Sequence, residues 1–352
     1  MQSRQFSHWL LVVVQALRVF WALVLRLVPG CGPLTVGICQ CEGSDNPNCW
    51  RDQLAFRTEV SSLLVYILLA SLTCSKSSLL QRSHLVIVLS VIGVQSLLLW
   101  IILLFPNATF FPLEIFSMFA AALYRVLQAV LFMDGAYELN DYLYANAVEA
   151  RRRLINSQAS NARLAMMISV SIVLLVGSLA TSIYLCIVFP EVTWCVVSAI
   201  VGSTLLLMVS ITSWCEHGSL MTSAVMFSYS IYLCCQVARI RPTSGVEEDL
   251  PTTMLGLLVP AVSLTYFAIS KSPARHLAGV TSVRSADGDD FEVNDFLLRI
   301  FVHFLADFYV TSVLAPRVSW LRFNIRAGTI FVCLLVYGWT LVAPKILSNR
   351  SF

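Results

Sequence analysis

Ten apolar stretches, each long enough to cross a bilayer, run through this sequence and constrain its fold more than any other feature. A span needs roughly 20 mainly apolar residues, and within lipid only helices and closed barrels satisfy their backbone hydrogen bonds. The stretches are continuous rather than alternating in polarity, which favours helices over barrel strands. We therefore expect ten spans, at Trp9–Val28, Phe56–Cys74, Leu85–Phe105, Phe111–Met133, Leu164–Phe189, Val192–Ile211, Ser219–Ala238, Thr252–Ser270, Phe296–Ala315 and Ala327–Leu347.

The composition agrees with a membrane protein. Of the 352 residues, 58% are hydrophobic and only 12% are charged, whereas about 25% of a soluble domain is charged. The net charge of +3 is spread along the chain. A nucleic-acid surface would need clustered Lys and Arg, so no nucleic-acid partner is expected. We expect one all-α membrane domain over residues 1–352.

Polar connectors separate the spans, and three of the long ones have a distinct composition or expected structure. Residues 29–55 form a Cys-containing lumenal loop, and residues 134–163 form a helix extension followed by a basic cytoplasmic turn. Residues 271–295 form a cytoplasmic loop whose Ser/Asp-rich part, Thr281–Asp290, is typical of a mobile segment.

Basic residues predict the orientation of the chain. With the N-terminus in the cytoplasm, cytoplasmic connectors hold about twice as many Lys and Arg residues as lumenal ones. Ten spans then leave both termini cytoplasmic. The expected location is a multi-pass protein of the endomembranes or the plasma membrane, and the sequence does not choose between them.

Two further signals agree with this orientation. Cys31, Cys39, Cys41 and Cys49 all fall in the first lumenal loop, where disulfides can form. The sequon that begins at Asn107 falls in the second lumenal loop and is a glycosylation candidate, whereas the sequon at Asn349 would be cytoplasmic. The cysteine spacing does not fit paired CxxC zinc ligands, so neither a metal nor a cofactor is expected.

Polar residues within and beyond the fourth span form the first candidate site. Asp134, Glu138 and Asp141 are spaced i, i+4 and i+7, which places them on one helix face, and Asn140 flanks that face. Helical character continues past the apolar stretch. A helix of about 40 residues would reach roughly 60 Å, so it must tilt or project from the bilayer.

A second candidate site lies near the C-terminus. Arg299, His303 and Asp307 are spaced by four, and Arg326 opens the tenth span. Asp307 at lipid depth needs a partner, for which Arg326 and His303 are the candidates. Two interpretations stay open: a polar groove that admits lipid headgroups, ions or protons, or a salt bridge that only fixes helix packing. No catalytic motif is present, and we do not expect an enzyme.

The C-terminal sequence is similar to the ending of a known family. The stretch Val336-Tyr337-Gly338-Trp339-Thr340-Leu341-Val342-Ala343-Pro344, followed by Leu347-Ser348-Asn349-Arg350-Ser351-Phe352, resembles the ending of the serine incorporator (SERINC) family. Weaker resemblances follow in order along the chain, at 127–141, 218–233 and 301–309.

The resemblance implies a fold and a role in lipid biology. The implied fold has about ten helices in two bundles crossed by a long tilted fourth helix. The implied role is passive phospholipid binding and transbilayer movement, with support of phosphatidylserine and sphingolipid metabolism. Membrane phospholipids are then the expected partners. Two alternatives remain: a scaffold for lipid-synthesis enzymes that use serine, and a proton-coupled small-solute transporter. The oligomeric state is left open.

Overall fold

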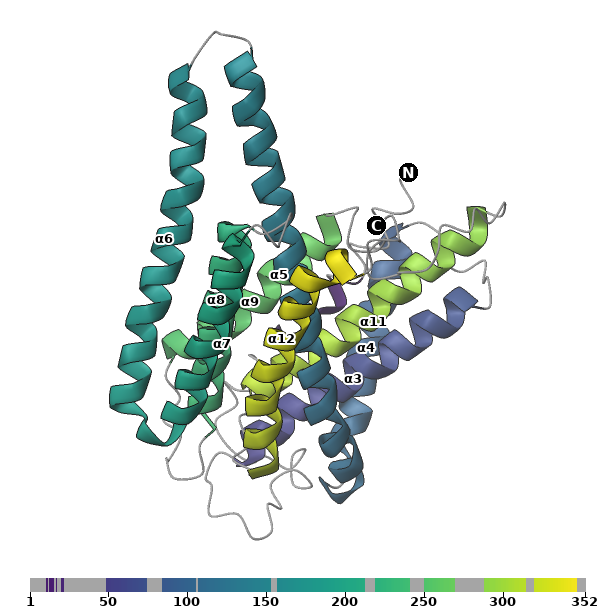
Figure 1. The fold of residues 1–352 in the computed structure, drawn as a ribbon. Coiled ribbons are helices and arrows are strands. Elements are labelled where there is room, and N and C mark those ends of the chain that lie inside the picture. Colours follow the sequence, from purple (N-terminus) through teal and green to yellow (C-terminus); the bar gives the residue numbers. More distant parts are fainter. Residues whose placement is uncertain are drawn as a thin grey trace. The chain divides into compact units, whose positions relative to one another are not determined.

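The computed structural model describes residues 49–74, 84–105, 107–152, 157–212, 219–240, 250–269, 288–314 and 320–346, with several residues between 11 and 21. Every regular element in these ranges is a helix (Figure 1). In chain order the elements are α3 Cys49–Cys74, α4 His84–Leu103, η3 Asn107–Phe110, α5 Phe111–Arg152, α6 Ser157–Val188, η4 Pro190–Val192, α7 Thr193–Ile211, α8 Leu220–Ala238, α9 Leu250–Ile269, α11 Gly288–Leu314 and α12 Trp320–Ile346.

Several of these helices are suited to crossing a membrane. Five segments of the described chain are long and apolar enough: Ile115–Ala145, Ala165–Val188, Pro190–Ile211, Leu220–Ala238 and Trp320–Ala343. The chain is therefore an all-α, multi-pass membrane protein. Each predicted span after the first coincides with one helix, whereas the first, Trp9–Val28, falls largely outside the described residues. The total of ten spans stays a prediction.

Two predicted connectors are partly helical, in contrast to the loops expected there. Helix α3 begins at Cys49, so residues 49–55 do not belong to the loop predicted over 29–55. Helix α11 begins at Gly288, within the predicted cytoplasmic loop 271–295 and the predicted mobile segment. Acidic residues are favourable in the first turn of a helix. Asp289 and Asp290 open α11, so it extends beyond its apolar part.

The predicted long fourth helix is confirmed. Helix α5 contains 42 residues. At 1.5 Å per residue it is about 63 Å long, roughly twice the hydrocarbon thickness of a bilayer. Helix α6 is also longer than a span, with 32 residues.

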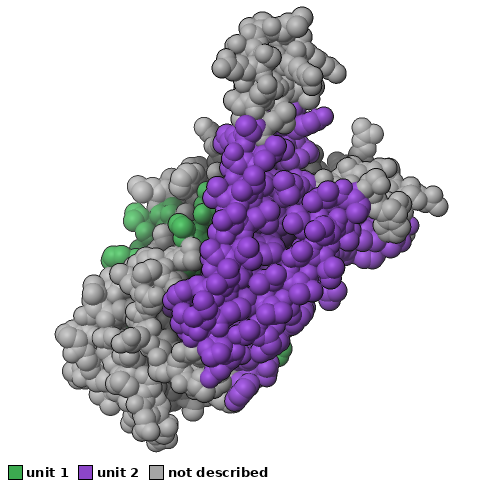
Figure 2. Space-filling model, turned by 60° about the vertical axis from the view of Figure 1, so that its left-hand side comes forward, with its two compact units in different colours: residues 1–124, 248–317 green, residues 125–247, 318–352 purple. Residues whose placement is uncertain are grey.

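The chain divides into two compact units, which are coloured separately in Figure 2. Unit 1 comprises residues 1–124 and 248–317, and unit 2 comprises residues 125–247 and 318–352. The division falls within α5, after Tyr124. Each unit is described by itself below.

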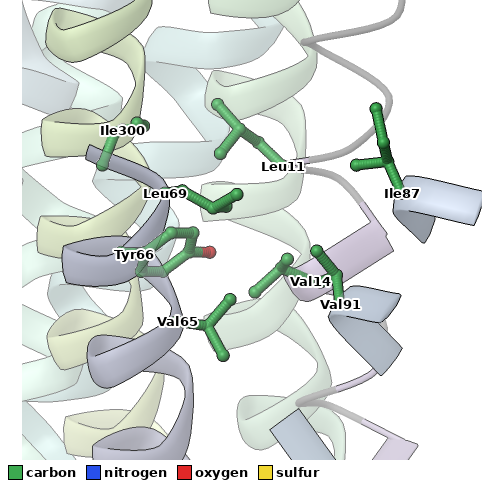
Figure 3. Close-up of a cluster of buried hydrophobic side chains, with 8 residues drawn as sticks. All are labelled: Leu11, Val14, Val65, Tyr66, Leu69, Ile87, Val91 and Ile300. Atoms are coloured by element: carbon green, nitrogen blue, oxygen red, sulfur yellow. The ribbon is translucent and has the colours of Figure 1, made fainter. Parts of the chain in front are cut away.

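In unit 1, α3 packs against α4 and α11, and α11 also packs against α9. Figure 3 shows the apolar cluster at the centre of this packing. Its buried members are Leu11, Val14, Val65, Tyr66, Leu69, Ile87, Val91 and Ile300. Residues from distant parts of the sequence thus form one core, which includes two residues of the predicted first span.

In unit 2, α8 is the central helix. It packs against α6, α7 and α12, and 72% of its span is buried. The corresponding buried shares are only 22% for α6 and 28% for α7. The exposed faces of α6 and α7 carry large apolar side chains such as Ile187, Val173 and Leu205. These faces are suited to contact with acyl chains.

Hydroxyl groups on α8 link it to its neighbours. The Ser223 hydroxyl lies 2.7 Å from that of Ser210 on α7 and 2.6 Å from that of Tyr337 on α12. The Ser178 hydroxyl on α6 donates to that of Ser228 on α8 at 2.8 Å. Lipid offers no competing hydrogen bonds, so such contacts hold membrane helices together.

Two glycines let α7 and α12 approach closely. A Cβ on Gly202 would lie 2.9 Å from Leu334 Cδ1, and a Cβ on Gly338 would lie 3.2 Å from Leu206 Cδ2. Each glycine thus accommodates a leucine of the other helix. Both pairs rise together in residue number, so α7 and α12 run parallel.

We predict that Gly202→Leu destabilises unit 2, because the new side chain must displace Leu334 from a packed interface. Overpacking of this kind costs about 1–3 kcal/mol. Thermal unfolding of the purified protein in detergent measures the effect. The matched control is Gly177→Leu on α6, where a Cβ meets nothing within 4 Å. Adding Leu334→Ala should restore part of the loss. Equal destabilisation by both single variants would contradict the proposed close contact.

Candidate functional site

The described helices bury an unusual set of ionisable side chains. The buried members are Arg57, Glu59, Arg125, Arg299, His303, Asp307, Arg322 and Arg326. The four candidate residues near the C-terminus, Arg299, His303, Asp307 and Arg326, are each less than 9% exposed.

Three of the buried arginines share one geometry: each donates to a carbonyl near the C-terminal end of a neighbouring helix. Arg57 Nη1 donates to the carbonyl of Ile102, near the end of α4. Arg299 Nη1 donates to the carbonyl of Phe267 at 3.4 Å, near the end of α9. Arg326 Nη1 donates to the carbonyl of Gln236 at 2.9 Å, near the end of α8.

These carbonyls are suited to an arginine partner. The last four carbonyls of a helix have no donor within the helix. The same end carries the negative pole of the helix dipole, which favours a cation. Aromatic rings add to the shelter, because the Arg57 guanidinium lies 5.1 Å from the Phe110 ring centroid and that of Arg299 lies 5.4 Å from the Phe267 centroid.

The predicted polar face of α11 in unit 1 is present. His303 Nδ1 lies 2.9 Å from the carbonyl oxygen of Arg299, and since that oxygen can only accept, Nδ1 carries the proton. Asp307 lies one turn further along and is 2% exposed. The predicted partner Arg326 belongs to unit 2, so the Asp307–Arg326 pair stays a prediction.

A tyrosine joins α5 and α9 to this part of unit 1. The Tyr124 and Ser263 hydroxyls are 3.1 Å apart, and the Tyr124 and Tyr309 ring centroids are 5.3 Å apart. All three residues are buried. The aromatic rings and hydroxyls therefore fix α5, α9 and α11 to one another within unit 1.

In unit 2, buried groups surround Arg125. The Tyr229 hydroxyl on α8 donates to the Arg125 carbonyl at 2.8 Å and to Gln128 Oε1 at 3.1 Å. The Cys333 thiol on α12 donates weakly to the same carbonyl at 3.9 Å. Arg125 and Gln128 thus lie where α5, α8 and α12 meet.

The contacts between α5 and α12 place the candidate residues in order. Cys333 contacts Arg125, and Thr340 Oγ1 lies 3.9 Å from Met133 Sδ, so α5 and α12 run parallel. The candidate polar groups follow one another in height, from Arg326 near the beginning of α12 to the extension of α5. At 3.6 residues per turn, Asp134, Glu138 and Asp141 lie on the side of α5 roughly opposite Arg125. We call this set the polar track: Arg326, Arg125, Gln128, Asp134, Glu138, Asn140 and Asp141.

Burial changes along the polar track. Arg326, Arg125 and Gln128 are buried, whereas Asp134 is only partly buried. Asn140 is also partly buried, and Glu138 and Asp141 are exposed. At a rise of 1.5 Å per residue, Asp134 lies about 13.5 Å beyond Arg125 along the axis of α5. The track therefore begins with sheltered cations and ends with accessible carboxylates.

Several buried polar residues are not among the candidates predicted from the sequence. Arg57, Glu59, Ser62 and Gln95 of unit 1 are all buried, and Gln95 Nε2 donates to the Ser62 hydroxyl at 2.9 Å. The presence of Glu59 inside an otherwise apolar stretch was the available signal. In unit 2, Tyr229 was missed because nothing local distinguishes it from an apolar packing residue.

The remaining sequence candidates are not tested. Cys31, Cys39 and Cys41 lie outside the described residues, and although Cys49 begins α3, its side chain is not described. Asn107 begins η3, and its side chain is likewise not described. The lumenal disulfides and the glycosylation stay predictions. Among the described residues, no group of three or more His, Cys, Asp and Glu residues could hold a metal ion.

We predict that Tyr229→Phe destabilises unit 2, because it removes the donor to the Arg125 carbonyl and to Gln128. The loss should be about 0.5–1.5 kcal/mol, the usual net contribution of one hydrogen bond. Thermal unfolding in detergent measures it. Tyr184→Phe on α6 is the matched control, since that side chain is 58% exposed. If both variants unfold like the unmodified protein, the Tyr229 hydroxyl does not contribute as inferred.

Comparison with known proteins identifies the family. No curated protein matches the chain. A family model described as serine incorporator (Serinc) matches residues 6–294, which is most of the chain. The match runs from just before the predicted first span into α11 and ends before the C-terminal stretch that carries the resemblance. Two different parts of the sequence thus lead to one conclusion: the chain belongs to the serine incorporator family.

Proposed function

We propose that this serine incorporator moves phospholipids passively between the two leaflets, with the headgroup following the polar track of unit 2. Membrane phospholipids are the proposed ligands. Movement of phosphatidylserine in this way would support the metabolism of serine-derived lipids. Family membership supports a SERINC-like role, and the proposal adds the residues that carry it.

The observation that carries the proposal is the order of charges along the track. In the described part of unit 2, the buried charged side chains are all arginines: Arg125, Arg322 and Arg326. The carboxylates Asp134, Glu138 and Asp141 follow further along α5, toward its extension. Phospholipid headgroups combine a phosphate anion with, in many lipids, an amine. Arginine is the side chain best suited to phosphate, and the carboxylates suit the amine.

The outer surface of unit 2 suits the acyl chains. Helices α6 and α7 are mostly exposed and apolar, so chains can remain in hydrocarbon beside them. A headgroup that leaves water loses hydration, and each polar group of the track replaces part of it. The barrier to crossing falls without any input of energy, and the lipid moves down its own gradient.

We predict that the purified protein in liposomes exchanges a fluorescent phosphatidylserine between leaflets. Dithionite bleaches the label in the outer leaflet, which is about half of the label in empty vesicles. In vesicles that contain the protein, it should bleach more than half. Arg125→Gln and Arg326→Gln should each slow the exchange several-fold, because each removes a charge that faces the phosphate. Arg326→Lys keeps the charge and should retain more activity than Arg326→Gln.

Controls separate loss of transport from loss of fold. Each arginine variant is compared with Tyr184→Phe, and its thermal unfolding is measured alongside. Bleaching no deeper than in empty vesicles, from a folded protein, would reject transbilayer movement. Unchanged exchange in both Arg→Gln variants would reject the track as its path.

Two other roles predict different results. A scaffold for lipid-synthesis enzymes would show no exchange alone, yet its deletion would lower incorporation of labelled serine into lipid. A proton-coupled solute transporter would acidify or alkalinise vesicles when a small solute is added. Pro260, inside α9, is the one feature that resembles the broken helices of transporters, and a second such break is not found in the described helices.

The proposed orientation has its own test. Both termini are proposed to be cytoplasmic, in the endomembranes or the plasma membrane. We predict that Asn107→Gln abolishes a glycosidase-sensitive mobility shift of the protein expressed in eukaryotic cells, because that sequon would be lumenal. Asn349→Gln is the control and should leave the shift unchanged. Loss of the shift in the Asn349 variant alone would show that the orientation is the reverse of the one proposed.

A further inference from the structure

Four cysteines gather at one end of unit 2, and the proposed lipid pathway does not use them. Cys186 lies in the last turn of α6, Cys195 in the first turn of α7, and Cys234 and Cys235 near the end of α8. All four are free thiols. They are separate from the cysteines of the first lumenal loop, for which disulfides were expected from the sequence.

Two of these thiols face one another. Cys195 and Cys234 are side-chain hydrogen-bond partners, and the Cys234 sulfur also lies 3.8 Å from the Cys195 carbonyl oxygen. Both side chains are fully buried. Helices α7 and α8 pack against each other directly, and the Ser210–Ser223 contact near their opposite ends shows that they are antiparallel. The two sulfurs are thus held together by a fixed helix pair.

The pair lies close to a membrane surface. Cys195 is two residues from the start of α7, or about 3 Å, and Cys234 is four residues from the end of α8, or about 6 Å. Trp194, next to Cys195, is 51% exposed, as is typical of tryptophan at the membrane interface. In the proposed orientation this end faces the lumen or the cell exterior, where disulfides persist.

We propose that Cys195 and Cys234 form a redox-sensitive disulfide that fastens the start of α7 to the end of α8. The oxidant is a disulfide of low molecular weight or of an oxidoreductase. One thiolate attacks it and forms a mixed disulfide, and the second thiolate then displaces the leaving sulfur. Two protein thiols become one disulfide, and the external disulfide becomes two thiols, having accepted two electrons and two protons.

The neighbouring thiols give the oxidant access to this buried pair. Cys186 and Cys235 are partly exposed, and both lie at the same end of unit 2 as Cys234. Thiol–disulfide exchange carries a mixed disulfide from an accessible sulfur to a buried one. The cluster thus combines thiols that an oxidant can reach with a buried pair, whose disulfide would be shielded from solvent.

The test uses the full chain in permeabilised membranes with a protease site inserted in the connector 213–218, between α7 and α8. Membranes are treated with oxidised glutathione, free thiols are blocked, and the chain is cleaved. On a non-reducing gel the two fragments should remain joined, and a reductant should separate them. After oxidation of the chain without the inserted protease site, mass spectrometry of its peptides should detect the linked Cys195–Cys234 peptide.

Variants assign the linkage. Cys195→Ala and Cys234→Ala should each reduce the joined fraction to that of the reduced sample. Cys333→Ala is the matched control, because it removes a buried cysteine from the same fragment as Cys234 and should leave the fragments joined. Fragments that separate after oxidation, or that stay joined in Cys234→Ala, would overturn the proposal.

Discussion

A buried arginine that donates to the C-terminal carbonyls of a neighbouring helix is the interaction on which both units depend. Placing such a charge in a bilayer costs roughly 2.5–3.5 kcal/mol on insertion scales. A hydrogen bond to a charged group contributes about 1.5–3 kcal/mol, and the helix dipole adds to it. Because the insertion cost and the hydrogen bond are of similar size, Arg57, Arg299 and Arg326 can be buried at helix ends. Burial of the same side chains elsewhere in the bilayer would be costly.

This interaction also fixes the direction of the helices. Since Arg326 reaches the carbonyl of Gln236, the start of α12 and the end of α8 lie at the same level of unit 2. The contacts of α12 with α7 and with α5 show that these three helices run parallel. Contacts between side chains thus fix the relative directions of α5, α7, α8 and α12 within unit 2.

The sequence could predict what depends on local pattern. Apolar length located the helices after the first, the long α5 followed from continuous helical character, and a spacing of four placed Arg299, His303 and Asp307 on one buried face. The helix boundaries at Cys49 and Gly288 could not be predicted, because hydropathy ends where a helix leaves the membrane. The partners of Tyr229 and Arg326 lie about 100 and 90 residues away in the chain, and no local pattern specifies them.

The arrangement of unit 2 explains why a polar path would run along α5. Helix α8 carries many hydroxyl groups, yet it is enclosed by α6, α7 and α12, and its hydroxyls are engaged with those helices. Helices α6 and α7 present apolar side chains outward. Among the described residues of unit 2, charged side chains become progressively exposed along the length of α5, from the buried Arg125 beside α12 to the exposed Glu138 and Asp141. A headgroup that must stay solvated while its acyl chains stay in lipid is therefore better served by α5 than by any face of α6 or α7.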